Sequence, residues 1–239
     1  MTIHDPDVVR SEYASEEGLR ARVCVYAGLA GPDSREIAFE AVRDAAPQRV
    51  LDVGCGWGEL AARIRDELGV GVVAIDISPR MVELARERGL DARMGDVQQL
   101  PLPDGEFDCA IAAHMLYHAA DIDRALGELA RVLRPGGTLV ASTNGKRHLE
   151  ELWLLVGRDK SKEDRHFFSE DGEELLRRHF AAVRRTDVES PLTFPDADAV
   201  RGYVASSIAH KHLADRVPEL EEPLVATRRG TVFVAERAA

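Results

Sequence analysis

The chain is 239 residues long, with 45% hydrophobic and 31% charged residues and a formal net charge of −11 at pH 7. This balance is typical of a globular protein and excludes a disordered or fibrous chain. An acidic surface repels nucleic-acid phosphates and anionic lipids, so the charge favours a small-molecule substrate over nucleic acid or a membrane. The basic pairs are short and set among acidic residues, which predicts solvated faces for Arg177-Arg178, Arg184-Arg185 and Arg228-Arg229.

No apolar run reaches the roughly 18–20 residues that a membrane span needs. The first residues also lack the apolar core and positive flank of a signal peptide. These features predict a cytoplasmic protein.

Hydrophobic periodicity predicts alternating helices and strands through the first part of the chain. Helices are expected at 8–30, 35–45, 59–69, 79–89 and 121–133. Strands are expected at 49–54, 71–78, 90–96, 107–114 and 135–144. The pattern then weakens, and it predicts helices at 148–157, 169–180 and 196–213, with strands at 181–194 and 230–238.

Strands that alternate with helices over residues 49–144 imply parallel pairing with right-handed crossovers. The expected fold is a doubly wound, Rossmann-like α/β sheet, mostly parallel with an antiparallel last strand. No linker rich in Gly, Ser or Pro divides the chain, so a single domain over 1–239 is expected. It would comprise an amino-terminal helical cap (1–45), a cofactor-binding core (49–144) and a substrate-side insertion with the final strands (145–239).

A glycine turn joins the strand at 49–54 to the following helix. The sequence DVGCGWGEL at 52–60 places Gly54, Gly56 and Gly58 there, where glycine lets the backbone approach a ligand closely. Dinucleotide-binding proteins have a similar turn, but with the spacing G-x-G-x-x-G. The carboxylate of Asp52 beside the turn disfavours a diphosphate and favours a cationic group, such as the ammonium of an amino acid.

Two further aspartates follow the next two strands. Asp76 ends the second strand, where a carboxylate can accept both hydroxyls of a ribose. Asp96 follows the third strand and could accept from the exocyclic amine of adenine. A single aspartate at such a position is as often a helix cap or turn residue, but three in register predict a pocket for ribose, adenine and an ammonium group.

The motifs VLDVGCGWGELA, VVAIDISPRMVELAR and MGDVQQLPLPDGEFDCAIAAHMLYHAADIDRALGELARVLRPGGTLV span roughly residues 49–142. In this order they resemble the motif series of class I S-adenosylmethionine-dependent methyltransferases, in the branch similar to quinone-biosynthesis methyltransferases. The resemblance implies S-adenosyl-L-methionine as cofactor and S-adenosyl-L-homocysteine as product. It implies contacts along the methionine part from Asp52, Gly54, Cys55 and Gly56. It implies ribose and adenine contacts from Asp76, Ile77, Met81, Asp96, Val97 and Gln98, and a sulfonium lining from Ala113 or His114.

The amino-terminal segment YASEEGLRARVCVYA resembles the leading helix that folds over the cofactor in some of these enzymes. The resemblance implies that Tyr13 and Arg22 close the pocket, with Arg22 pairing with the methionyl carboxylate. The alternative is an exposed arginine on an amphipathic helix.

Methyl transfer from a sulfonium needs acceptor and methyl carbon held in line and shielded from water. A hydroxyl acceptor also loses a proton, a task suited to histidine. His114 and His118 follow the fourth strand, where cofactor and acceptor must meet, so both are candidate catalytic bases. The alternative is that they pack against the cofactor or cap the next helix. No metal site is expected, because Cys109 lies in a buried strand and no second ligand pair follows.

The acceptor pocket is expected to be roofed by the amino-terminal helix and by 145–180 and 191–227. Its candidate lining residues are His148, Trp153, His166, Phe167, Phe168, Tyr203, His210 and His212. A methyltransferase of RNA or protein is a second hypothesis, disfavoured by the acidic balance and by the absence of an Asn-Pro-Pro-type signature after the fourth strand. A non-catalytic or NAD(P)-binding Rossmann protein is a third, for which G-x-G-x-x-G is expected. The acceptor, the methylated atom (O, N or C) and the oligomeric state are not determined by the sequence.

Overall fold

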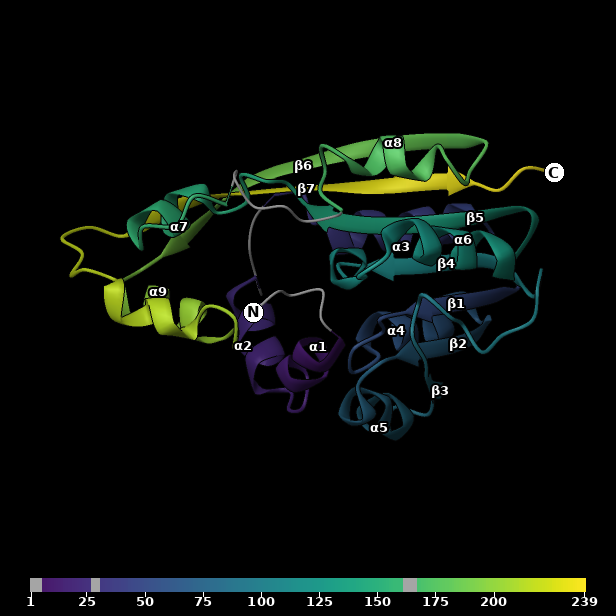
Figure 1. The fold of residues 1–239 in the computed structure, drawn as a ribbon, viewed down its shortest axis with the longest axis horizontal. Helices are drawn as coiled ribbons and strands as arrows, with labels where there is room; N and C mark the ends of the chain where they lie inside the picture. Colours follow the sequence, from purple (N-terminus) through teal and green to yellow (C-terminus); the bar gives the residue numbers. More distant parts are fainter. Residues whose placement is uncertain (1–5, 27–30, 161–166) are drawn as a thin grey trace.

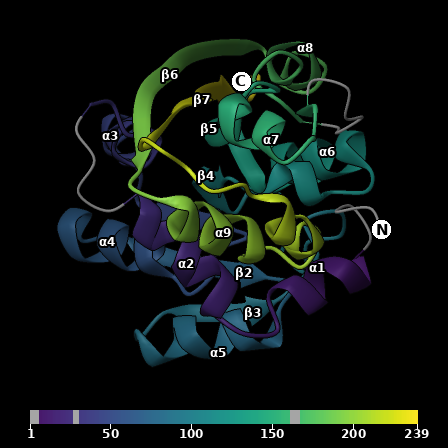
Figure 2. The ribbon, with the colours of Figure 1, turned by 90° about the vertical axis from the view of Figure 1, so that its left-hand side faces the viewer.

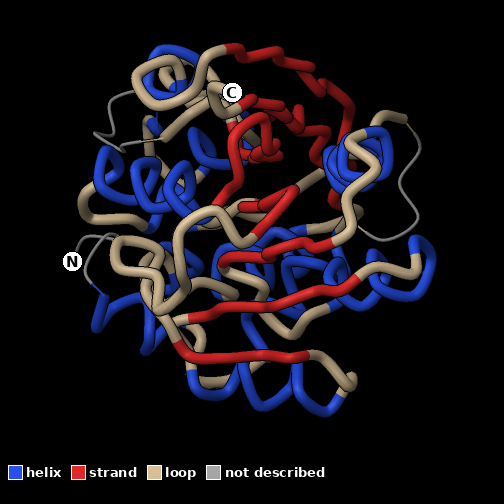
Figure 3. Tube along the Cα trace, turned by 90° about the vertical axis from the view of Figure 1, so that its right-hand side faces the viewer, coloured by secondary structure: helices blue, strands red, loops and turns tan. Residues whose placement is uncertain are grey.

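The computed structural model describes residues 6–26, 31–160 and 167–239. A seven-stranded sheet with the order β3-β2-β1-β4-β5-β7-β6 lies at its centre, and helices cover both faces (Figure 1 and Figure 3). The strands are β1 (Arg49–Val53), β2 (Gly71–Asp76), β3 (Asp91–Met94), β4 (Phe107–Ala113), β5 (Leu133–Asn144), β6 (Ala182–Phe194) and β7 (Leu224–Glu236).

Strands β1 to β5 pair in parallel, whereas β7 lies antiparallel between β5 and β6. The predicted fold class, a mostly parallel sheet with an antiparallel last strand, is therefore confirmed. The last strand begins at Leu224, earlier than the predicted residue 230, because β6 pairs with β7 along its full length. Parallel pairing brings the carboxyl ends of β1, β2 and β4 to the same edge of the sheet.

The helices are α1 (Pro6–Glu12), α2 (Glu17–Val25), α3 (Ser34–Asp44), α4 (Glu59–Leu68), α5 (Pro79–Glu87), α6 (Ile122–Val132), α7 (Glu150–Leu155), α8 (Gly172–Leu176) and α9 (Ala197–Ala205). Short 3₁₀ turns are η1 (Leu116–His118) and η3 (Lys211–Arg216). Local chemistry sets their ends. Asp33 accepts a hydrogen bond from the backbone of Arg35 at the start of α3, and Gly69 ends α4 in the left-handed conformation.

The helix predicted at 8–30 is instead two helices, α1 and α2, and 27–30 lies outside the described residues. The chain turns between them because the backbone oxygen of Tyr13 accepts a hydrogen bond from the Ser78 hydroxyl, at 2.8 Å. The Glu16 carboxylate, at the start of α2, forms an ion pair with Arg80. The segment between α1 and α2 thus contacts the start of α5 and does not continue the backbone hydrogen bonds of one helix.

Two buried clusters pack on the two faces of the sheet. Side chains of α3, α4 and α5 form one cluster with the strands, and side chains of α6, α8 and β7 contribute to the other. A third cluster joins α7, α9 and the ends of β6 and β7 beyond the sheet. Helix α9 lies beside α2 (Figure 1 and Figure 2), so the segment between β6 and β7 and the amino-terminal helices meet over the carboxyl edge of the strands. Among the described residues, no helix combines the length and apolar character needed to cross a membrane.

Candidate functional site

A cavity of about 400 Å³ lies at the carboxyl ends of the parallel strands, beneath α2 and the segment after α1. Most of the predicted site residues line it, namely Tyr13, Arg22, Gly54, Cys55, Gly56, Asp76, Ile77, Asp96, Val97, Gln98, Ala113, His114 and His118. Asp52 and Met81 are not in the lining and are buried. The tertiary structure therefore gathers nearly the whole predicted set around one space, and the role of each residue stays a prediction.

The glycine turn is shaped by backbone conformations that other residues rarely adopt. Gly54 and Gly56 have φ angles of 67° and 55°. A Cβ atom on Gly54 would lie 2.6 Å from the side chain of Met115. The backbone nitrogen of Gly54 donates to the carbonyl oxygen of Ile75 at 2.8 Å, which fixes the turn against β2. The turn thus presents bare backbone to the cavity.

Asp76 is held by backbone donors at the end of β2. Its Oδ2 accepts from the nitrogen of Gly56 at 2.9 Å, and its Oδ1 accepts from the nitrogen of Ser78 at 2.9 Å. Burial raises the pKa of this carboxyl, while the backbone donors act in the opposite direction. Each oxygen still has a lone pair, so the carboxylate can accept hydroxyl donors from a ligand.

Asp52 lies next to this turn and is 2% exposed. Burial, with a smaller contribution from the charge of Asp76, raises its pKa from the ordinary value of 3.8 to about 8. The side chain is therefore protonated near neutral pH. A cationic ligand group close to both carboxyls would favour its ionised form.

The loop after β3 arranges Asp96 and Gln98 as one unit. The backbone nitrogen of Gln98 donates to Oδ1 of Asp96 at 2.8 Å, and the Gln98 side-chain nitrogen donates to both oxygens of the same carboxylate at 3.1 and 3.2 Å. The Gln98 side-chain oxygen accepts from the nitrogen of Asp121 at 2.8 Å. This loop is thereby tied to the start of α6.

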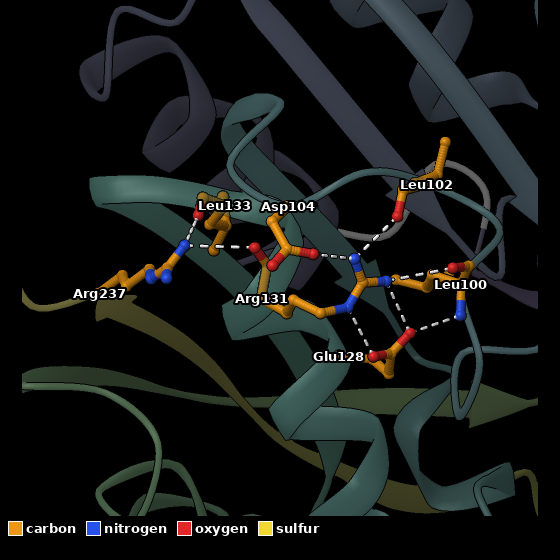
Figure 4. Close-up of polar contacts among 7 residues, drawn as sticks. All are labelled: Leu100, Leu102, Asp104, Glu128, Arg131, Leu133 and Arg237. Carbon is orange, nitrogen blue, oxygen red and sulfur yellow. Dashed lines mark hydrogen bonds and ion pairs between the residues drawn. The ribbon is translucent and has the colours of Figure 1, made fainter.

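Arg131 of α6 holds the continuation of the same loop, as Figure 4 shows. Its guanidinium donates to the carbonyl oxygens of Leu100, at 3.1 Å, and Leu102, at 2.8 Å, and pairs with Asp104 at 2.6 Å. Glu128 pairs with Arg131 and accepts from the nitrogen of Leu100 at 2.7 Å. The loop that carries the predicted adenine contacts is therefore fixed from the side away from the cavity.

Three histidines around the cavity hydrogen-bond to hydroxyl groups from the amino-terminal segment. The Nε2 atoms and hydroxyl oxygens are 3.1 Å apart in His118 and Tyr13, 3.1 Å in His114 and Ser34, and 3.3 Å in His148 and Tyr26. These bonds attach Tyr13, Tyr26 and Ser34 to the segments that follow β4 and β5. His114 also has a φ angle of 53°, and burial, followed by the charge of Arg35, lowers its pKa to about 4, so it is neutral at neutral pH.

The Arg22 side chain is largely buried, and one of its two terminal nitrogens is already engaged by the protein. Its Nη1 donates to Glu12 and to the backbone oxygen of Ser206, each at 2.7 Å. Its Nη2 is buried and has no hydrogen-bond partner within the described part of the chain. One edge of the guanidinium is thus available to an anionic group.

A side cavity of about 120 Å³ shares part of its lining with the main one. Four of the predicted acceptor-side residues line it, namely His148, Trp153, Tyr203 and His210. Phe167 and Phe168 are buried and, like His212, line neither cavity, and His166 lies outside the described residues.

The sequence reasoning missed Ser34 and Arg228. Arg228 was predicted to be on a solvated face, but it is 8% exposed and lines the main cavity. No local signal distinguishes it from Arg229 beside it, because the side chain of Arg228 lies against Pro32 and Tyr26, which are distant in the sequence. Ser34 lies at the expected start of a helix, and its position in the sequence does not indicate its contact with His114.

Comparison with known proteins gives one family-model match, a methyltransferase domain, over residues 51–141. An uncharacterised methyltransferase of Mycobacterium tuberculosis is 34% identical over 209 residues, which cover 81% of this chain and 82% of that protein. A demethylmenaquinone methyltransferase of Thermus thermophilus is 42% identical over 113 residues, 44% of this chain and 51% of that protein. The chain thus spans about half the length of that curated relative.

A solved structure of a phosphoethanolamine N-methyltransferase of Haemonchus contortus, in complex with phosphomonomethylethanolamine and S-adenosylhomocysteine, aligns with a TM-score of 0.64. The alignment covers 100% of this chain and 61% of that one at 17% identity. At this identity the likeness concerns the fold alone.

Proposed function

Because this chain belongs to the class I S-adenosylmethionine-dependent methyltransferases, in the branch similar to quinone-biosynthesis methyltransferases, we propose that it methylates a small-molecule acceptor. The observation that carries the proposal is the cavity at the carboxyl edge of the sheet. There a bare glycine turn and the carboxylates of Asp76 and Asp96 surround one space.

The residues present fit S-adenosylmethionine. Gly54 and Gly56 line the cavity and carry no side chain, so the methionine part can lie along the backbone of the turn. The unpaired Nη2 of Arg22 would meet the methionyl carboxylate. When bound, the cofactor supplies a methyl group on a positively charged sulfur.

Further roles follow the same layout. Asp76 would accept the ribose hydroxyls, and Asp96, Val97 and Gln98 would take the adenine edge. Ala113 and His114, at the end of β4, would line the space beside the sulfur. Met81 is buried and does not line the cavity, so it would support the residues that contact the adenine and would not touch it directly.

The chain's other task is to hold the acceptor and exclude water. The amino-terminal cap, attached through its hydroxyl groups to the three histidines, covers the cavity. His114 and His118 are the candidate bases after β4. We further propose that residues 1–239 act as one domain in the cytoplasm, and that the net charge of −11 favours a small molecule over nucleic acid.

Isothermal titration calorimetry tests the proposal. We expect S-adenosylmethionine and S-adenosylhomocysteine to bind with micromolar affinity, and a dissociation constant of about 1 μM corresponds to about 8 kcal/mol. NAD at the same concentration serves as the control for a dinucleotide-binding protein. Tight binding of NAD together with no binding of either methionine derivative would refute the proposed function.

A further inference from the structure

The main cavity is charged unevenly along the sheet. Asp76 and Asp96 lie at the ends of β2 and β3, whereas Arg228 lies on β7, on the far side of β1, β4 and β5. Neighbouring strands are about 4.8 Å apart, so β2 and β7 are separated by about 19 Å. One end of the cavity is therefore acidic and suits a cationic cofactor, and the other end contains a buried cation.

Arg228 is a buried guanidinium with no counter-ion in the part of the chain that the structure describes. Its Nη2 donates to the carbonyl oxygen of Pro32 at 2.9 Å, and its guanidinium carbon lies 5.4 Å from the centre of the Tyr26 ring. Within the described residues it forms no ion pair, whereas Arg229 beside it has Glu189 at 3.7 Å. Burying an uncompensated charge is costly, and a ligand with negative charge would offset that cost.

A chain of hydrogen bonds begins at the Tyr26 ring that Arg228 faces. The Tyr26 hydroxyl lies 2.8 Å from the Tyr203 hydroxyl and 3.3 Å from Nε2 of His148. Nδ1 of His148 lies 2.8 Å from the carbonyl oxygen of Arg229, and the Arg229 nitrogen donates toward the same Nδ1 at 3.1 Å. We assign the Nδ1 proton to the shorter contact, and this tautomer leaves a lone pair on Nε2.

The charges around His148 are consistent with a neutral imidazole. Burial, followed by the positive charge of Lys160, lowers its pKa well below the ordinary value, and His114 and Arg228 act in the same direction. Burial also raises the pKa of Tyr26, so its hydroxyl keeps its proton. The Tyr26 hydroxyl thus carries a proton, and the His148 imidazole beside it is uncharged.

We infer that the methyl acceptor presents a hydroxyl at this end of the cavity, that Arg228 stabilises the oxygen's negative charge, and that His148 receives its proton through Tyr26. This inference rests on the proposed function. The acceptor's O–H bond breaks and its proton passes to Tyr26, whose own proton moves to Nε2 of His148. The oxygen bonds to the methyl carbon as the S–CH₃ bond breaks, which leaves a neutral thioether. An ammonium acceptor would instead be repelled by Arg228.

The test uses 4-nitrophenol, a hydroxyl compound whose anion is coloured, with the protein saturated with S-adenosylhomocysteine. We expect the complex to bind the phenolate, with an absorbance that reports its ionisation, and to bind benzylamine much more weakly. Arg228→Gln should weaken phenolate binding by about 10- to 100-fold, since it removes a charged donor. Arg228→Lys should restore part of it. Arg201→Gln, which removes a surface cation paired with Asp198 and Glu219, is the matched control and should change nothing.

Two further variants address the proton. His148→Gln and Tyr26→Phe should bind the probe but show the phenolate band only at higher pH than the wild type, because the proton has no receiver. Unchanged phenolate binding by Arg228→Gln, or preference for benzylamine, would overturn the inference. A loss of S-adenosylhomocysteine affinity in Arg228→Gln would overturn it as well, because Arg228 would then hold the cofactor's carboxylate. Each of these results leaves the proposed function standing, which fails separately if the wild type binds neither methionine derivative.

Discussion

The hydroxyl oxygen of Tyr13 lies 3.1 Å from Nε2 of His118, although 105 residues separate them in the sequence. Tyr13 follows α1 and His118 ends η1, so this hydrogen bond joins the amino-terminal cap to the core across the cavity. Burial raises the pKa of Tyr13, so the hydroxyl stays protonated. We therefore expect this contact to slow the exit of a ligand from the cavity.

Tyr13→Phe removes this hydroxyl without removing the ring. We expect S-adenosylhomocysteine to dissociate about 2- to 10-fold faster, since one hydrogen bond contributes about 0.5–1.5 kcal/mol. Stopped-flow fluorescence would measure the rate. Thr231→Val, which removes a buried hydroxyl bonded to Asp187 outside the cavity, is the control for a general loss of stability. Equal dissociation rates in Tyr13→Phe and the wild type would show that the bond does not retain the ligand.

Asp76→Ala should weaken S-adenosylhomocysteine binding by about 1–3 kcal/mol, because two ribose hydroxyls lose a charged acceptor. Calorimetry measures the affinity, and circular dichroism shows whether the variant is folded, since Asp76 also accepts from Gly56 and Ser78. Asp91→Ala, on the edge strand β3, removes an exposed carboxylate paired with Arg93 and should bind normally. An unchanged dissociation constant in folded Asp76→Ala would make Asp76 a structural residue.

Asp52 makes the stability of the free protein depend on pH. Its pKa is about 8 in the folded state against an ordinary value of 3.8, so between these values the folded state keeps a proton that the unfolded state loses. Stability is therefore fully present at low pH and falls as the pH rises from 3.8 to about 8. Asp52→Asn should abolish this dependence and gain stability over the wild type at about pH 9, but not at about pH 4. Urea unfolding at both pH values measures it, and parallel curves for the two proteins would contradict the prediction.

The histidines can be separated by their alanine variants. If the residue removes the acceptor's proton, its alanine variant should turn over about 10²–10⁴-fold more slowly and bind the cofactor with normal affinity. A residue that packs against the cofactor should lose affinity but keep its turnover at saturating cofactor. We expect His148 in the first class, because its partner Tyr26 faces Arg228, and His114 and His118, whose partners are Ser34 and Tyr13, in the second. If His118→Ala lost turnover but kept its cofactor affinity, His118 and not His148 would be the base.

Arg131→Lys should loosen the loop that follows Asp96, because lysine cannot donate to two carbonyl groups and two carboxylates in the same plane. We expect weaker binding of S-adenosylhomocysteine and less discrimination against S-inosylhomocysteine, which lacks the adenine amine. Arg201→Lys changes a similar surface arginine on α9 and should alter neither. Preserved discrimination in Arg131→Lys would confine Arg131 to a role in stability.

The part of the fold that could be predicted is the part set by local sequence. The strands β1 to β5 and helices α3 to α6 follow from hydrophobic periodicity and from caps such as Asp33, Gly69 and Pro79. The break between α1 and α2 could not be predicted, because it depends on the contact between Tyr13 and Ser78, which is 65 residues away. The early start of β7 likewise depends on its partner strand β6.

The site divides in the same way. The sequence alone determined the glycine turn and the aspartates at strand ends, since the order of strands and turns already places them on one edge. Only the tertiary structure decided the surroundings of three other side chains. Arg22 pairs with Glu12, Met81 is buried outside the cavity lining, and Arg228 is buried in it. The physical reason is that charge and burial of these side chains depend on segments brought together only by folding. A basic pair suggests a solvated face in the sequence, but Arg228 of that pair is a buried cation in the structure, because Tyr26 and Pro32 of the amino-terminal segment lie against it.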